Sequence, residues 1–414
     1  MAERRASSGP AGPWTERRTG GAAGGPADRR AAGGPAYWRA DRRTGGAAGG
    51  VADRRAAGGG GADSGAPAGG SMGEQASTAT PIIETADVSK HFSAGRAGTG
   101  WSATGRARAT LKAVDGVSLA IRRGETLALV GETGSGKTTF GRLLLGLYRP
   151  TSGDIRYQGR SILDRKGEAA RAVRRQIQGV FQDPYSSLNP AMTVGQSLAE
   201  VLKVHRVVKR KDRAQKVAEL LETVGLSPAQ ASRRPVAFSG GERQRIGIAR
   251  ALAVSPDIVI ADEPLSALDV SIQAQVLNLM IRLQDERGLT YLFVTHDLDV
   301  ARHISQRTAV LYLGRVVEYA PTESLFAEPL HPYTQALVRA APRLTTERKK
   351  IKPALTGDIP NAIDRPTGCH FHPRCPFAMP VCKEQEPLLR ELSPTQSVAC
   401  HLHDPAMTPA AASG

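Results

Sequence analysis

The chain has 414 residues, of which 40% are hydrophobic and 5% aromatic, and its formal net charge is +16. That length is ample for a large core, so the sequence excludes a peptide or a small domain held together by disulfides. No run of about 18 consecutive apolar residues occurs, which excludes a membrane-spanning helix, and the Met-Ala-Glu-Arg-Arg start lacks the apolar core of a secretory signal, which favours the cytoplasm.

The first part of the chain, residues 1–71, consists mainly of Gly, Ala and Arg and contains a duplication of the segment 17–34 at 42–59. A repeat protein would need Leu, Ile or Phe in each unit to build a core, and these units have none. Such a composition cannot offset the entropy of ordering, so residues 1–72 are predicted to be a disordered tail. Translation from Met72 and a functional basic arm are both open alternatives.

The positive charge indicates anionic partners, but its distribution does not favour nucleic acid. Residues 1–71 hold eleven Arg and six acidic residues, and the rest of the excess is spread over the remaining chain. A surface that faces anionic lipid headgroups explains this distribution at least as well as DNA does. We expect no specific nucleic-acid partner.

From Pro81 onward, short β-rich runs alternate with amphipathic helical patterns. The runs at 82–92 and 113–121 indicate antiparallel strands, whereas 126–130 is a continuous apolar run of the kind buried in a parallel sheet. Further predicted elements are a helix from Thr138 to about Tyr148 and strands at 257–262 and 290–296. This alternation predicts an α/β domain with a mostly parallel core sheet.

The segment that follows the apolar run, Gly131-Glu-Thr-Gly-Ser-Gly-Lys-Thr138, fits the pattern G-x-x-x-x-G-K-S/T between a strand and a helix. Its glycines let the backbone wrap a phosphate, and N–H groups at the helix start point at that phosphate. Lys137 should neutralise the β- and γ-phosphates, and the Thr138 hydroxyl should ligate Mg²⁺. The predicted ATP-binding residues here are Gly131, Glu132, Thr133, Gly134, Ser135, Gly136, Lys137, Thr138 and Thr139.

An acidic pair ends the strand at 257–262. Asp262 lies where a carboxylate would meet the metal held by the phosphate loop, and Glu263 is the candidate general base that polarises the attacking water.

A second anion-binding turn, Ser239-Gly-Gly-Glu242, opens a helix between these two motifs. One chain needs only one such turn for each γ-phosphate. We therefore predict that Ser239, Gly240, Gly241 and Glu242 contact a nucleotide held by a partner subunit.

Together these motifs resemble those of the ATP-binding subunit of ABC transporters, over about residues 82–403. The resemblance implies a P-loop ATPase domain at 80–328, with a RecA-like parallel-sheet core, an antiparallel β subdomain and a helical subdomain that carries the signature turn. It also implies the cofactors ATP and Mg²⁺.

Further residues match elements of that family. Gln182 matches the Gln loop, which links Mg²⁺ and water to the membrane partner, and His296 matches the switch histidine at the γ-phosphate. Ser266 and Asp269 match the loop that communicates across the dimer, and Phe92 falls where an aromatic ring stacks on adenine. The family signature usually has Gln where this chain has Glu242, a carboxylate that would either lower efficiency near a phosphate or cap the helix instead.

The C-terminal part of the sequence indicates which kind of ABC transporter the chain resembles. Segments 331–342, 368–382 and 398–400 are similar to the C-terminal region of oligopeptide/dipeptide importers, which nickel importers share. A C-terminal domain is thus expected at 329–405, followed by a flexible tail at 406–414. The implied function is ATP hydrolysis coupled to peptide uptake, with uptake of nickel or another small solute as the alternative.

The partners implied by this resemblance are membrane proteins and a second ATPase. The segment around Gln182 is similar to the second of the two ATPases of such importers, so a heterodimer with a sibling ATPase is expected. Two membrane permeases and an extracellular substrate-binding protein complete the assembly, and the chain would lie peripherally on the cytoplasmic face of the plasma membrane.

All four cysteines lie in the C-terminal region. In a cytoplasmic protein such a group indicates a metal site before disulfides. Three alternatives are open: thiolate ligation of a 4Fe–4S cluster, which similar tails are thought to carry, a zinc site, or free thiols. The candidate ligands are Cys369, Cys375, Cys382 and Cys400, with His370, His372, His401 and His403 as further donors.

A soluble ABC ATPase of translation or DNA repair is a second class of function. The chain has a single phosphate loop and no sustained heptads, whereas those proteins have two ATPase halves or long coiled coils. A P-loop kinase or GTPase does not account for the Ser-Gly-Gly turn and His296.

Overall fold

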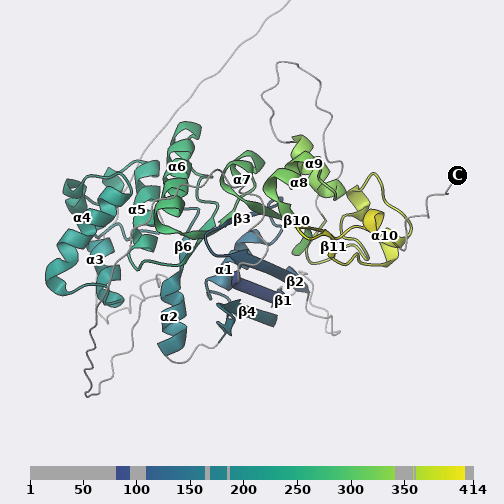
Figure 1. The fold of residues 1–414 in the computed structure, drawn as a ribbon, viewed down its shortest axis with the longest axis horizontal. Coiled ribbons are helices and arrows are strands. Elements are labelled where there is room, and N and C mark those ends of the chain that lie inside the picture. The colour runs from purple at the N-terminus through teal and green to yellow at the C-terminus, as the bar shows by residue number, and fades with distance from the viewer. Residues whose placement is uncertain are drawn as a thin grey trace, which may run out of the picture. The chain divides into compact units, whose positions relative to one another are not determined.

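The structure is a computed structural model that describes residues 81–93, 109–163, 168–183, 187–340, 358 and 360–405 (Figure 1). These residues belong to one compact unit of the chain. The predictions for 1–72 and for 406–414 lie outside the described residues.

A four-stranded antiparallel sheet has the order β2-β1-β4-β5. It consists of β1 (Pro81–Ser93), β2 (Thr110–Arg122), β4 (Ser152–Tyr157) and β5 (Arg160–Ser161). Apolar side chains of its strands and of the first helix share one core. The two antiparallel strands that the sequence predicts at 82–92 and 113–121 are confirmed.

The larger sheet has eight strands in the order β11-β12-β10-β9-β3-β8-β7-β6. Its parallel part comprises β3 (Thr126–Val130), β6 (Ile177–Val180), β7 (Ile258–Asp262), β8 (Thr290–Val294) and β9 (Arg307–Tyr312). Every residue of β3, β7 and β8 is buried, which explains why these strands have no polar alternation. The antiparallel part comprises β10 (Arg315–Pro321), β11 (Arg390–Ser393) and β12 (Gln396–Val398).

The helices of the ATPase region surround this sheet. They are α1 (Lys137–Leu144), α2 (Glu168–Gln176), α3 (Val194–Val204), α4 (Arg213–Thr223), α5 (Gly240–Leu252), α6 (Val270–Arg287) and α7 (Leu298–Ile304). Helices α3, α4 and α5 pack on one another, as Figure 1 shows at the left, and share an apolar core with α6. The predicted helix at 138–148 ends early because Gly146 takes a left-handed φ of 67°.

Helix α8 (Thr322–Ala327) follows β10, and the C-terminal region adds α9 (Pro332–Ala340) and α10 (Val381–Glu384). Short 3₁₀ helices lie at Arg210–Asp212, Pro228–Ser232, Pro235–Ala237, His372–Arg374 and His401–His403. Strand β12 pairs with β10, so the C-terminal region continues the sheet of the ATPase domain. Among the described residues, none of the helices combines the length and the hydropathy needed to cross a bilayer.

Candidate nucleotide site and cysteine-bearing tail

The phosphate loop joins β3 to α1, and two of its glycines are sterically required. Gly136 precedes α1 with a φ of 104°, and a Cβ there would lie 2.1 Å from the Ala113 carbonyl oxygen. A Cβ on Gly131 would lie 2.2 Å from the carbonyl oxygen of Leu311. No described side chain caps α1. Backbone N–H groups of a loop at a helix start can bind an anion, and that role of this loop stays a prediction.

Lys137 lies inside this loop. Its ammonium donates hydrogen bonds to the carbonyl oxygens of Gly131 at 2.7 Å and Glu132 at 2.9 Å. Burial lowers the pKa of Lys137, whereas the carboxylates of Glu263, Asp262 and Glu132 raise it. The ammonium charge of Lys137 is thus held inside the loop, where it would neutralise a bound polyphosphate.

The two oxygen donors predicted for Mg²⁺ lie together. The Thr138 hydroxyl donates a hydrogen bond to Oδ1 of Asp262 at 2.9 Å. Burial raises the pKa of Asp262, and the Thr138 hydrogen bond opposes that rise. A hydroxyl and a carboxylate are the kind of oxygen ligands Mg²⁺ takes beside phosphates, so this pair fits the ion. Gln182 is exposed after β6, and within the described part of the chain no hydrogen bond joins it to either residue.

The candidate base and the switch histidine meet at the ends of β7 and β8. Glu263 Oε1 lies 3.4 Å from His296 Nδ1, and the Glu263 side chain is largely buried while His296 is half-exposed. Glu263 has a left-handed φ of 46°, and its N–H donates to the Val294 carbonyl oxygen at 2.9 Å. A hollow beside this pair is lined by Glu263, Pro264, Leu265, Ser266, Gln273, Phe293, Thr295, His296, Asp297 and Val300.

Phe92 lies in β1 beside Tyr148, which follows α1. The two rings are edge to face with centroids 5.5 Å apart, and Lys90 Nζ lies 5.1 Å from the Phe92 centroid. The Phe92 ring is half-exposed. Stacking of Phe92 on adenine stays a prediction.

The signature turn forms a complete capping box at the start of α5. Glu242 accepts hydrogen bonds from the Ser239 N–H at 2.8 Å and from the Ser239 hydroxyl at 3.0 Å. These hydrogen bonds, the backbone one first, lower the pKa of Glu242. The Glu242 carboxylate thus caps the helix, one of the two outcomes that the sequence leaves open.

The second glycine of the turn allows close packing, because a Cβ on Gly241 would lie 2.3 Å from Ile272 of α6. The predicted dimer-loop residues lie nearby in the chain and are exposed. Ser266 donates its hydroxyl to the Glu263 carbonyl oxygen at 3.1 Å, and Asp269 precedes α6. Within the described residues, no hydrogen bond joins the signature turn to the phosphate loop, and its contact with another chain's nucleotide stays a prediction.

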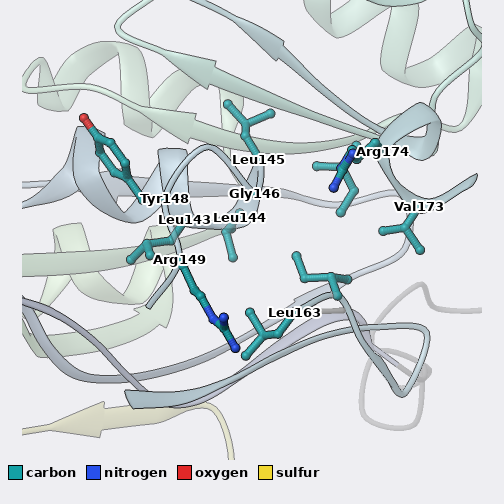
Figure 2. Close-up of a pocket in the computed structure, with 11 residues that line it drawn as sticks. Leu143, Leu144, Leu145, Gly146, Tyr148, Arg149, Leu163, Val173 and Arg174 are labelled. Atoms are coloured by element: carbon teal, nitrogen blue, oxygen red, sulfur yellow. The ribbon is translucent and has the colours of Figure 1, made fainter. Parts of the chain in front are cut away.

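Figure 2 shows a different hollow, which lies beneath the end of α1. Leucines of α1 and Val173 of α2 line it, and its charged side chains are Arg149 and Arg174. Its lining includes no carboxylate or hydroxyl from the phosphate loop, so it does not belong to the nucleotide site.

The four cysteines of the tail have free thiols and influence one another. Burial, with a smaller contribution from the neighbouring Cys382, Cys400 and Cys375, raises the pKa of Cys369 to about 12. Burial likewise raises the pKa of Cys400 to about 11. Among the described residues, no three His, Cys, Asp or Glu side chains are arranged to hold one metal ion.

The flanking histidines have backbone partners. A ring nitrogen lies within hydrogen-bond distance of a carbonyl oxygen in His372 (Cys369, 3.0 Å), His401 (Gln385, 2.9 Å) and His403 (Leu330, 3.1 Å). For His370, burial lowers the pKa to about 4. These contacts give three of the histidines a structural role.

Sequence reasoning missed two residues that reach the phosphate loop from the C-terminal region. Arg374 pairs with Glu132, and the Tyr333 hydroxyl accepts the N–H of Glu132. The only sequence signal for Arg374 is a basic residue beside Cys375, which does not reveal a partner 242 positions away.

Comparison with known proteins gives matches over both regions. A family model described as "ABC transporter" matches residues 114–266, and one described as "Oligopeptide/dipeptide transporter, C-terminal region" matches residues 317–382. The oligopeptide transport ATP-binding protein AppF of Bacillus subtilis is 50% identical over 326 residues, which cover 78% of this chain and 97% of that protein. The dipeptide transport ATP-binding protein DppF of Haemophilus influenzae is 48% identical over 290 residues, which cover 70% and 89%.

Two solved structures are similar to part of the chain. The cbiO1 structure from Clostridium perfringens, part of the ABC transporter complex cbiONQ, has a TM-score of 0.51 at 26% identity and covers 60% of this chain and 91% of its own. The ATP-binding cassette MJ0796, in a post-hydrolysis dimer bound to ADP and Pi, has a TM-score of 0.50 at 29% identity and covers 58% and 99%.

Proposed function

The chain belongs to the ATP-binding subunits of ABC transporters that carry the oligopeptide/dipeptide C-terminal region, and on this premise we propose that it drives peptide uptake across the plasma membrane. It is an ABC-type ATPase with ATP and Mg²⁺ as its cofactors. The observation that carries the proposal is that the Thr138–Asp262 and Glu263–His296 pairs lie in the same chain as the importer-type tail.

The residues of this site have distinct tasks in hydrolysis. The N–H groups of the loop and Lys137 would bind the phosphates. Thr138 and Asp262 would hold Mg²⁺, which when bound would supply positive charge beside the phosphates. Glu263 orients and polarises the attacking water. His296, next to Glu263, would contact the γ-phosphate, and Gln182 would be a further ligand of Mg²⁺.

We propose that the signature turn of this chain contributes to the nucleotide site of a partner chain. Ser239, Gly240, Gly241 and Glu242 would face that nucleotide, and Ser266 and Asp269 would report across the dimer. Val236 and Val270, which lie just before α5 and at the start of α6, are 78% and 81% exposed. Exposed apolar side chains beside the turn support a partner chain there, and we expect it to be a sibling ATPase.

An ABC importer ATPase acts on membrane permeases, which are this chain's partners. We propose two permeases, contacted through the segment after Gln182, and an extracellular binding protein that delivers the peptide. The chain would then lie peripherally on the cytoplasmic face of the membrane. We assign 80–328 to the ATPase domain and 329–405 to the importer-type C-terminal domain.

We also propose that the tail binds a 4Fe–4S cluster through Cys369, Cys375, Cys382 and Cys400. The support is the chemistry of the donors, four cysteines within one short C-terminal region. In the described residues the thiols are not arranged around a common ion, so the cluster would have to draw them together. Anaerobically purified protein should be brown, with about four irons per chain, and Cys382→Ser should lose most of the iron. Colourless protein with one tightly bound zinc would show a structural zinc site instead of a cluster. Metal-free protein with four titratable thiols would exclude both kinds of site.

The function is tested with the chain co-purified with its sibling ATPase and two permeases in liposomes, with the binding protein outside. Uptake of radiolabelled trialanine should require ATP and should be lost with Lys137→Ala. ATP-driven uptake of Ni²⁺ without uptake of trialanine would assign the chain to a metal importer. Hydrolysis without any uptake would contradict the importer role.

A further inference from the structure

The second residue of the phosphate loop, Glu132, is bound by the C-terminal region. Nη1 and Nη2 of Arg374 donate to its two carboxylate oxygens at 2.8 and 3.0 Å. The Arg374 side chain is 5% exposed and that of Glu132 is 20% exposed. A shielded, two-point pair of this kind fixes the orientation of both side chains more firmly than a surface pair does.

The backbone of the same residue is bound as well. The N–H of Glu132 donates to the Tyr333 hydroxyl at 2.9 Å, and Tyr333 is fully buried. Its ring packs against Tyr312 at 4.6 Å and Phe371 at 5.4 Å between centroids. Both ends of Glu132 therefore contact residues that follow the ATPase domain in the chain.

Arg374 belongs to the cysteine-bearing segment and is held firmly there. It ends the 3₁₀ helix His372–Arg374, between Cys369 and Cys375. Phe371 of this segment is 1% exposed and joins a core with Val130, the residue before the phosphate loop. The segment and the loop are thus two sides of one packed layer.

Charge gives this contact a consequence for ATP. The Glu132 carboxylate is close enough to Lys137 to raise the pKa of that lysine. A carboxylate in a loop that must receive a polyphosphate opposes binding, and the Arg374 guanidinium compensates it. Without Arg374, the loop would present one uncompensated negative charge to the nucleotide.

We propose that Arg374, with Tyr333, is a positioning residue for the phosphate loop: the tail orients Glu132 and neutralises it, and so sets the affinity for ATP. This inference rests on the proposed ATPase function and does not depend on a metal in the tail. The interaction is the same in the ground state and the transition state, so its loss should raise KM and leave kcat nearly unchanged.

The test measures ATP hydrolysis by the assembled transporter. Arg374→Gln should raise KM for ATP about ten-fold, the size expected for a charge-assisted hydrogen bond, with kcat changed less than about two-fold. Arg374→Lys should recover part of the loss. Adding Glu132→Gln to Arg374→Gln should bring KM back toward that of Glu132→Gln alone, because the uncompensated charge is gone.

The matched control is Arg390→Gln. Arg390 pairs with Asp404 at 2.9 Å within the C-terminal region, and among the described residues no hydrogen bond or ion pair joins it to the phosphate loop, so KM should not change. Tyr333→Phe, which removes the acceptor of the Glu132 N–H, is the second variant if Arg374→Gln does not fold. It should raise KM a few-fold, because one hydrogen bond is lost.

Two results would overturn the inference. One is an unchanged KM in folded Arg374→Gln, and the other is a double variant no better than Arg374→Gln. Absence of hydrolysis in the wild-type assembly would contradict the proposed function instead, so the two failures are distinguishable.

Discussion

At the start of α1 the carboxylate of Glu132 is bound by Arg374, whereas at the start of α5 the carboxylate of Glu242 accepts hydrogen bonds from Ser239. Both helices follow glycine-rich turns whose N–H groups attract anions. In the first turn a residue of the tail keeps the acid occupied, and in the second the acid itself caps the helix. A glycine-rich turn is therefore available to a phosphate only when its own acidic side chains have other partners.

The largest effect is expected at the candidate general base, which serves the nucleotide bound at the α1 turn. Glu263→Gln should leave ATP binding intact and reduce hydrolysis by about 10²-fold or more, because the group that polarises water is lost. Nucleotide should then accumulate in closed dimers, measured by ATP retention on a gel-filtration column. Wild-type turnover in the assembled variant would count against this role for Glu263.

The packing of α5 provides a matched pair of glycine substitutions. Gly241→Ala places a Cβ against Ile272 and should destabilise the chain by about 1–3 kcal/mol, the usual cost of overpacking. Gly247→Ala, in the same helix, meets nothing within 4 Å and should be neutral or stabilising by about 0.5–1 kcal/mol. Thermal unfolding compares the two, and equal melting temperatures would contradict the packing argument.

Replacing the capping acid Glu242 should make the α5 turn more like the α1 turn in charge, because neither turn would then present an uncompensated carboxylate. Glu242→Gln removes a negative charge near the partner's phosphate and retains an acceptor for the Ser239 N–H. We expect kcat/KM for ATP to rise about two- to five-fold, the effect of about 0.3–1 kcal/mol for a charge at a helix end. A decrease in kcat/KM would mean that the carboxylate assists at this position.

The effect of Glu242→Gln on the stability of the fold should depend on pH. The Ser239 hydrogen bonds lower the pKa of Glu242 below its ordinary value of 4.5 in the folded chain. A lowered carboxyl pKa stabilises the fold above the unfolded value, and that stabilisation is lost as the pH falls through the folded value. Wild type should therefore be more stable than Glu242→Gln at pH 7, and the difference should shrink below about pH 4.5. A constant difference between pH 7 and pH 3.5 in chemical denaturation would exclude this cause.

The smallest effect is expected outside both turns. Deleting residues 1–71 should change neither the ATPase rate nor the melting temperature, because that segment lacks apolar groups to pack. A melting temperature several degrees lower would show that the segment packs on the rest of the chain.

The sequence was sufficient where a site is built from one continuous segment. The loop around Lys137, the strand that ends at Asp262 and the turn at Ser239 each combine a short motif with a buried strand or a helix. The meeting of Thr138 with Asp262 also followed from the sequence, since parallel strands end at the same edge of a sheet.

The sequence was not sufficient where contacts join distant segments. Arg374 and Tyr333 lie more than 200 positions from Glu132, and their partners depend on how the tail folds back. The pairing of β12 with β10 was missed for a similar reason, because a three-residue strand has too few residues to show a period.

The pairing of β12 with β10 also protects the edge of the sheet against pairing with another molecule. Without the tail, β10 would be the last strand on its side of the sheet and would expose a row of backbone groups ready to pair with another copy. Strand β11, which replaces it as the border, is short, fully exposed and begins with the charged residues Arg390 and Glu391. Such a border discourages edge-to-edge association. A chain cut after α9 would lose it, and self-association would follow even if the nucleotide site stayed folded.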